Sequence, residues 1–113
     1  MTKIIFSFFF TFACVASAEI IEFRIVKGTG SQAWNSPGQT LMLKVGDTLR
    51  IYNDDDVVHQ LHTPGRPCSH GRSFAPGTSF DCVASKSYSL SRDGAIYDHG
   101  HGPKAPFYIL VNE

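Results

Sequence analysis

The sequence predicts an all-β domain built as a two-sheet antiparallel sandwich, and three observations support this fold class. Short segments rich in branched and aromatic residues recur along the chain. In several of them the apolar residues occupy alternate positions, which is typical of strands with one buried face. Glycine, proline and serine bound the segments, and no stretch after residue 18 shows a helical period. These features are expected of two packed sheets with short connections.

The expected strands are distributed over the whole domain. They cover residues 20–27, 41–45, 48–52, 79–83, 87–91, 96–98 and 107–111. Gly46 and Asp47 separate the second strand from the third and predict a tight turn, because glycine adopts a positive φ at little cost. The segment 28–40, which contains Trp34, is expected to be a long loop that packs over one end of the sandwich.

Residues 1–18 have the composition of a secretory signal peptide. Lys3 precedes an apolar run that ends in Ala16, Ser17 and Ala18, so cleavage is expected after Ala18. The run is shorter than the ~20 apolar residues that a transmembrane helix needs. A retained anchor and lipidation at Cys14 are the alternatives, although the residues before Cys14 match a lipoprotein signal poorly. The sequence therefore predicts a domain over residues 19–113 that is periplasmic or secreted and has no membrane span after cleavage.

Length and charge restrict the function. The chain has 113 residues, ten basic and ten acidic, with a formal net charge of +0. This length accommodates one small domain and excludes a two-domain enzyme. Since the sequence contains no basic run, it offers no surface for a phosphate backbone, and nucleic acid is not expected as a partner.

Two cysteines remain after cleavage, Cys68 and Cys82. An even number of cysteines in an exported domain predicts a disulfide between them. Closing a loop of about 15 residues would stabilise the fold by roughly 3 kcal/mol in the chain-entropy model.

All five histidines lie in the second half of the chain, which makes metal binding the first chemical question. They are His59, His62, His70, His99 and His101. His99 and His101 flank Gly100, and two residues apart in extended chain they would point to the same side. Asp98 precedes them and could bind a metal or orient a histidine. The alternative is a glycine-rich turn with solvated histidines.

The other three histidines are weighed individually. His59 follows the strand 48–52 and is expected at the same end of the sandwich as His99. His62 would face away from His59 in continuous strand, and is expected to support the site or to lie exposed. His70 is two residues from Cys68 and could share a metal with it only if Cys68 were reduced.

Three stretches resemble the cupredoxins, the plastocyanin-like small blue copper proteins. They are GDTLRIYNDDDVVH (46–59), APGTSF (75–80) and DGAIYDHGHGPKAPFYILV (93–111). The resemblance covers most of residues 20–113. It implies a Greek-key sandwich, a copper cofactor and His59 as the first histidine ligand.

The closing loop departs from the family pattern. Cupredoxins place a cysteine, a histidine and usually a methionine there, but the cysteine's place falls at or beside His99 and the methionine's near Ala105. His99 and His101 are therefore positional replacements for missing ligands. Imidazoles with Asp98 or water suit tetragonal Cu(II), so a colourless or pale site is expected.

The sequence thus predicts an exported copper-binding cupredoxin-like protein, with His59, His99, His101 and Asp98 as the metal site. Electron transfer or periplasmic copper handling would be its role, and a redox or copper-transfer protein its partner. A small type 2 copper enzyme and a metal-free sandwich that acts as a binding module are the alternatives.

Overall fold

The computed structural model describes residues 17–113, so residues 1–16 of the expected signal peptide lie outside the described residues. Seven strands form the domain: β1 (Ile20–Ile25), β2 (Leu41–Lys44), β3 (Thr48–Asn53), β4 (Leu61–His62), β5 (Ser79–Val83), β6 (Tyr97–Asp98) and β7 (Ile109–Asn112). A 3-10 turn, η1 (Pro37–Gln39), and one helical turn, α1 (Leu90–Asp93), complete it. No helix in this described part is long and apolar enough to cross a membrane.

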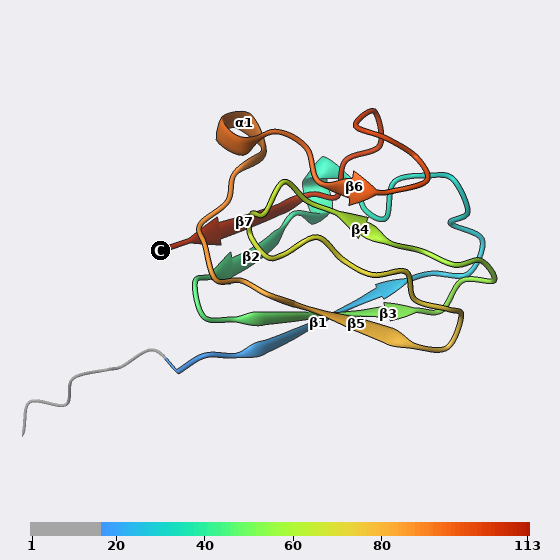
Figure 1. Cartoon of the computed structure of the whole chain (residues 1–113), viewed down its shortest axis with the longest axis horizontal. Helices are drawn as coiled ribbons and strands as arrows, with labels where there is room; N and C mark the ends of the chain where they lie inside the picture. The colour runs from blue at the N-terminus through green and yellow to red at the C-terminus, as the bar shows by residue number, and fades with distance from the viewer. Residues whose placement is uncertain (1–16) are drawn as a thin grey trace, which may run out of the picture.

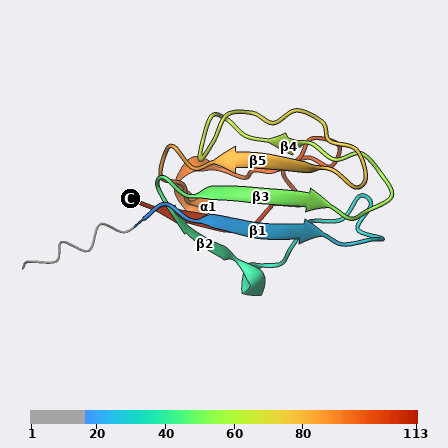
Figure 2. The ribbon, with the colours of Figure 1, turned by 90° about the horizontal axis from the view of Figure 1, so that it is seen from below.

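The strands lie in two layers. One sheet has the order β1-β3-β5, and the opposite layer carries the ladders β2-β7 and β4-β6 (Figure 1). Figure 2 shows the three-stranded sheet face on, with its strands side by side. The predicted all-β sandwich is confirmed.

The strand directions are mixed rather than purely antiparallel, which corrects one detail of the expectation. β1 pairs with β3, and β2 with β7, in parallel, whereas β3-β5 and β4-β6 are antiparallel. The reason lies in the turn at Gly46. It joins β2 to β3 across the two layers instead of closing a hairpin, and so leaves both strands free to pair with other partners.

That turn is held by a buried carboxylate. Gly46 adopts a φ of 102°, as expected for a tight turn, and its N–H donates to Ala84 O at 2.8 Å. Asp47 is only 2% exposed and accepts from the N–H groups of Lys44 and Glu19 and from the Lys44 ammonium at 2.9–3.0 Å. These backbone N–H donors, and then the ammonium, lower the pKa of Asp47 to about 2.

The core lies between the layers. Its fully or nearly buried apolar residues are Ile25, Trp34, Leu43, Leu49, Ile51, Leu61, Cys68, Phe74, Cys82, Ala84, Tyr88, Ile96, Phe107, Ile109 and Val111. Phe107 is central, with ring centroids 5.0 Å from both Phe23 and Trp34. The long loop 28–40 lies at the end of the sandwich where other long loops gather (Figure 1). Trp34, within this loop, is buried against the core.

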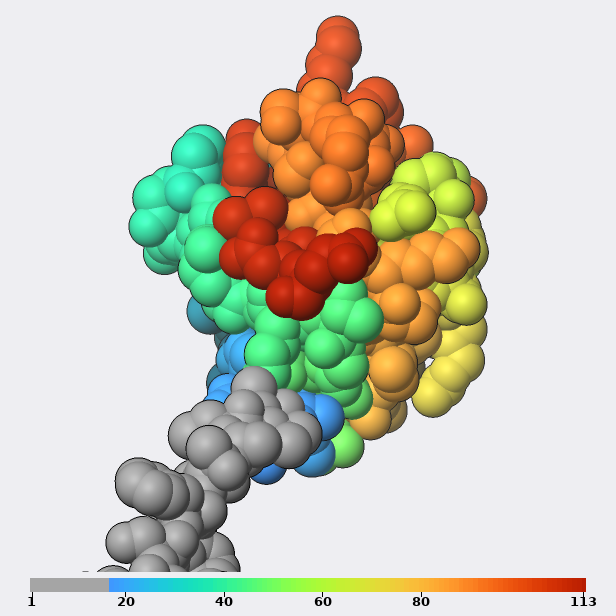
Figure 3. Space-filling view, turned by 90° about the vertical axis from the view of Figure 1, so that its left-hand side faces the viewer, coloured from blue at the N-terminus to red at the C-terminus, as the bar shows by residue number. Residues whose placement is uncertain are grey.

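The segment expected as a strand at 87–91 is only partly extended. Tyr88 forms a single bridge with Val111, and the chain then turns into α1. The Asp93 carboxylate accepts from Ser89 N–H at 3.0 Å, and this local bond favours a helical turn over a longer ladder. Figure 3 shows the C-terminal residues packed between this region and the β2-β3 turn.

The predicted disulfide is confirmed. Cys68 and Cys82 are bonded with a Cα–Cα distance of 5.5 Å and a sequence separation of 14. Cys82 lies in β5, so the bridge ties the segment after β4 to the three-stranded sheet.

Candidate metal centre

His59 occupies the interior at the loop-rich end of the sandwich. Its side chain has no exposed surface, and its backbone bridges to Phe74. Asn53, at the end of β3, shapes the loop that leads to it: its amide donates to Val57 O at 2.8 Å and its carbonyl accepts from Asp55 N–H at 3.0 Å. This Asx-type bonding turns the chain so that His59 points inward.

Asp55 fixes the orientation of the His59 ring. Its carboxylate accepts from His59 Nε2 at 2.9 Å and from the N–H groups of Gly28 and Gly30 at 2.9 and 2.8 Å. The hydrogen bond from His59, followed by that from Gly30 N–H, lowers the pKa of Asp55. Both ring nitrogens of His59 face carboxylates, Nε2 that of Asp55 and Nδ1 that of Asp98, so the two acceptors together fix the plane of the ring.

Asp98, in β6, lies against that inner nitrogen. Its Oδ2 contacts His59 Nδ1 and accepts from Trp34 Nε1 at 3.2 Å, while Oδ1 accepts from Gly100 N–H at 3.0 Å. The residue is 5% exposed. A buried carboxylate is costly unless it is paired, and these donors supply the pairing.

His101 completes the buried group. Its Nε2 lies 3.4 Å from Asp98 Oδ2 but makes no hydrogen bond to any residue in 17–113, although the atom is buried. An imidazole nitrogen left in this way loses its hydration without recovering a partner. One ligand atom from each of His59, Asp98 and His101 lies within 4.8 Å of the other two. The unpartnered nitrogen and the nitrogen-oxygen donor set fit a divalent transition metal.

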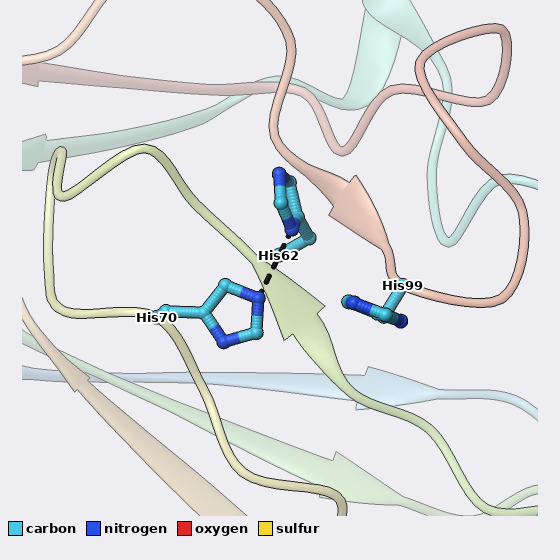
Figure 4. A group of neighbouring side chains, drawn as sticks. All are labelled: His62, His70 and His99. Atoms are coloured by element: carbon cyan, nitrogen blue, oxygen red, sulfur yellow. Dashed lines mark hydrogen bonds between the residues drawn. The ribbon is translucent and has the colours of Figure 1, made fainter.

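His99 was expected in the same site, but the structure places it elsewhere. Asp98 is the last residue of β6, and the chain then turns, with His101 N–H donating to Asp98 O at 2.9 Å. The alternation of extended chain therefore does not apply to His99 and His101. His99 instead groups with His62 and His70 on the exterior, as Figure 4 shows.

This exterior group was not foreseen. One ligand atom from each of its three histidines lies within 4.8 Å of the others. Partial burial, and then the neighbouring charges of His70 and His99, lower the pKa of His62. One indication of this group was available from the sequence, the expectation that His62 faces away from His59. No sequence pattern showed which residues His62 would contact.

Sulfur ligands are lacking in both groups within residues 17–113. Cys68 and Cys82 are consumed by the disulfide, and Met42 lies in β2, 59% exposed and outside both groups. The described donors are therefore imidazole and carboxylate alone.

Comparison with known proteins supports the fold. No protein-family model matches the sequence, and no curated protein matches it. Among solved structures the chain is similar to a "Novel Purple Cupredoxin from Nitrosopumilus maritimus", with 19% sequence identity and a TM-score of 0.56. The match covers 81% of this chain and 99% of that one. The chain thus has the cupredoxin fold.

Proposed function

We propose that the protein is an exported copper-binding cupredoxin-like protein whose buried group holds the metal. His59 Nδ1, the Asp98 carboxylate and His101 Nε2 would be the ligands. The observation that carries the proposal is the buried His101 Nε2, which faces Asp98 and has no hydrogen-bond partner in the described chain. The fold and the donor set support the same assignment.

The surrounding residues prepare this group for a metal. Asp55 holds His59 through Nε2, which leaves Nδ1, beside Asp98, as the nitrogen that would bind the metal on loss of its proton. A histidine held by a carboxylate through its other nitrogen is the usual arrangement behind a metal-binding imidazole. Trp34 covers His59 with its ring centroid 5.8 Å away and donates to Asp98, which positions the carboxylate. The side chains of His59 and Asp98 are 0% and 5% exposed, so bulk water is largely excluded.

The donor set favours copper handling in the Cu(II) state. Two imidazoles and a carboxylate are harder than the thiolate and thioether ligands that suit Cu(I). Bound copper would supply a centre that accepts and releases one electron. We propose electron transfer or copper handling as the role, with a periplasmic redox or copper-transfer protein as partner.

Export is part of the proposal. It rests on the composition of residues 1–18 and on the disulfide, which is typical of oxidising compartments. Full-length protein produced in a bacterium should be recovered from the periplasm or the medium with Glu19 as its first residue, as shown by intact mass. Retention of residues 1–18 in the cell would overturn it.

The metal proposal is tested by titrating the purified protein with Cu(II) and recording electron paramagnetic and visible spectra. We expect a specific, weakly coloured signal component with nitrogen coupling, from one equivalent of Cu(II), that is lost in His101→Ala. His99→Ala, which changes only the exterior group, is the matched control and should retain the signal. Thermal unfolding should shift upward with Cu(II), because a ligand that binds only the folded state stabilises it.

The same experiment separates the alternatives. Absence of a specific signal, with no change in thermal unfolding, would favour a metal-free binding module. Turnover of superoxide or peroxide that is lost in His101→Ala would favour a small copper enzyme.

A further inference from the structure

Three histidines from separate segments converge on the exterior of the β4-β6 ladder. His62 lies in β4, His99 follows β6 directly, and His70 belongs to the segment after the disulfide residue Cys68 (Figure 4). Since they come from three separate segments of the chain, the cluster is assembled by the tertiary fold and not by a local motif.

The three rings form a compact triangle. The centroid of His62 lies 4.9 Å from that of His70 and 5.6 Å from that of His99, and the remaining pair is 5.5 Å apart. His62 Nδ1 and His70 Nε2 approach to 3.0 Å. His70 and His99 are exposed and His62 is half-buried, so an ion could reach the nitrogens from solvent.

The proton on His70 is assigned by its backbone neighbour. Its Nδ1 lies 2.9 Å from the carbonyl oxygen of Gly71, which can only accept, so Nδ1 carries the proton. Nε2 is then the nitrogen with a lone pair, and it points toward His62. A metal-binding imidazole typically shows this division between its two nitrogens.

The backbone holds the cluster on both sides of β4. His99 N–H donates to Gln60 O at 2.7 Å, and Gly71 N–H donates to Leu61 O at 2.9 Å. The Gln60 side chain adds a bond to Gly71 O at 2.9 Å. The approach of Gly71 is so close that a Cβ atom there would lie 2.9 Å from Leu61 O. The residues flanking the histidines are therefore fixed without a ligand.

His62 is also held by its ring. It stacks on Tyr97, its direct partner in the β4-β6 ladder, with centroids 4.7 Å apart and planes inclined by 23°. Stacking restricts rotation of the imidazole and lowers the entropy lost when a ligand orders it.

From this geometry we propose that His62, His70 and His99 form a second, solvent-accessible site for a divalent transition-metal ion. Three imidazoles would bind one face of the ion and leave its other positions to water or to a ligand from a partner. Such a donor set accepts Zn(II) and binds Cu(II) more tightly. The site shares no ligand with the buried group, so it stands or falls independently of the proposed function.

Zn(II) is the probe of choice because it is diamagnetic. Histidine ring nitrogens of the ¹⁵N-labelled protein are observed by long-range proton-nitrogen correlation during a Zn(II) titration. We expect the signals of His62, His70 and His99 to move together and to saturate at one equivalent for this site, with His70 Nε2 as the bound nitrogen. His62→Ala combined with His70→Ala should abolish that equivalent.

Two controls isolate the site. Ser69→Ala changes an exposed neighbour of His70 and should leave binding unchanged, whereas His101→Ala removes only a ligand of the buried group. If the exterior signals saturate in His101→Ala, the second site exists whatever the buried group does. If those signals stay fixed while His59 and His101 respond, the proposed function survives and the second site is refuted. A His99 ring signal that still shifts and saturates at one equivalent in the double variant also refutes it.

Discussion

Trp34 donates a hydrogen bond from its indole nitrogen to the Asp98 carboxylate, across 64 positions of sequence and inside the core, at a distance of 3.2 Å. The contact joins the long loop 28–40 to β6, which no strand ladder connects directly. It therefore does two things: it stabilises a buried carboxylate by a hydrogen bond, and it orients that carboxylate toward His59 and His101.

Replacing Trp34 with Phe should separate this bond from the packing of the ring. The phenyl ring keeps contact with Phe74 and Phe107 but has no donor for Asp98. We expect a loss of about 1–3 kcal/mol in the free energy of unfolding, as for a hydrogen bond to a charged group. Cu(II) affinity, measured by competition with a chelator, should fall roughly tenfold. Unchanged affinity would reduce Trp34 to a packing residue.

Asp55→Asn should weaken metal binding without touching a ligand. The asparagine side chain cannot present two equivalent anionic oxygens to His59 and to the N–H groups of Gly28 and Gly30. We expect Cu(II) affinity to fall by about 10–100-fold. Asp56→Asn is the matched control, since the side chain of Asp56 is 72% exposed and its substitution should leave affinity unchanged. Equal effects of the two substitutions would contradict the role of Asp55.

Asp47 should make stability depend on pH. Its pKa is about 2 in the folded protein, below the value of about 3.9 for an unperturbed carboxyl. A depressed folded-state pKa contributes stability above the unfolded value, which is lost as the pH falls from about 4 to about 2. Asp47→Asn should therefore unfold more easily than the unaltered protein near neutral pH, and this difference should shrink on acidification. Denaturant unfolding at several pH values measures it, and a constant difference would exclude the ionised carboxylate as its cause.

Removing the disulfide by Cys68→Ser and Cys82→Ser should destabilise the fold by roughly 3 kcal/mol, the chain-entropy value for a loop of this length. Because Cys68 is two residues from His70, the exterior cluster should also lose order, seen as broadened ring signals of His70. The unaltered protein treated with a reductant is the parallel case. A variant with normal stability and sharp His70 signals would show that the segment is held by its other contacts.

Local sequence patterns predicted the strands that carry the sheets. Alternating apolar residues in 41–45 and 48–52 anticipated β2 and β3, and Gly46 anticipated the turn between them. They did not predict strand partners, because β2 and β3 pair in different sheets and pairing is decided by tertiary contacts. They also missed β4, which has only two residues, too few for a periodicity.

The candidate site shows the same boundary between local and tertiary information. The placement of His59 at this end of the sandwich followed from its position after β3. The separation of His99 from His101 did not, because it results from a turn whose bonds run from Gly100 and His101 to Asp98. The meeting of His70 with His62 depends on the passage of Gly71 beside Leu61, which is visible only in the folded chain.

The peptide link between Asp98 and His99 joins a residue of the buried group to a residue of the exterior cluster. Asp98 is buried and His99 is exposed, so these two sequence neighbours cross the wall of the protein from its interior to its surface. The covalent path from the Asp98 side chain to the His99 side chain crosses a single peptide unit. The β4-β6 ladder is thus the thin part of this wall, with one group of candidate ligands on each side of it.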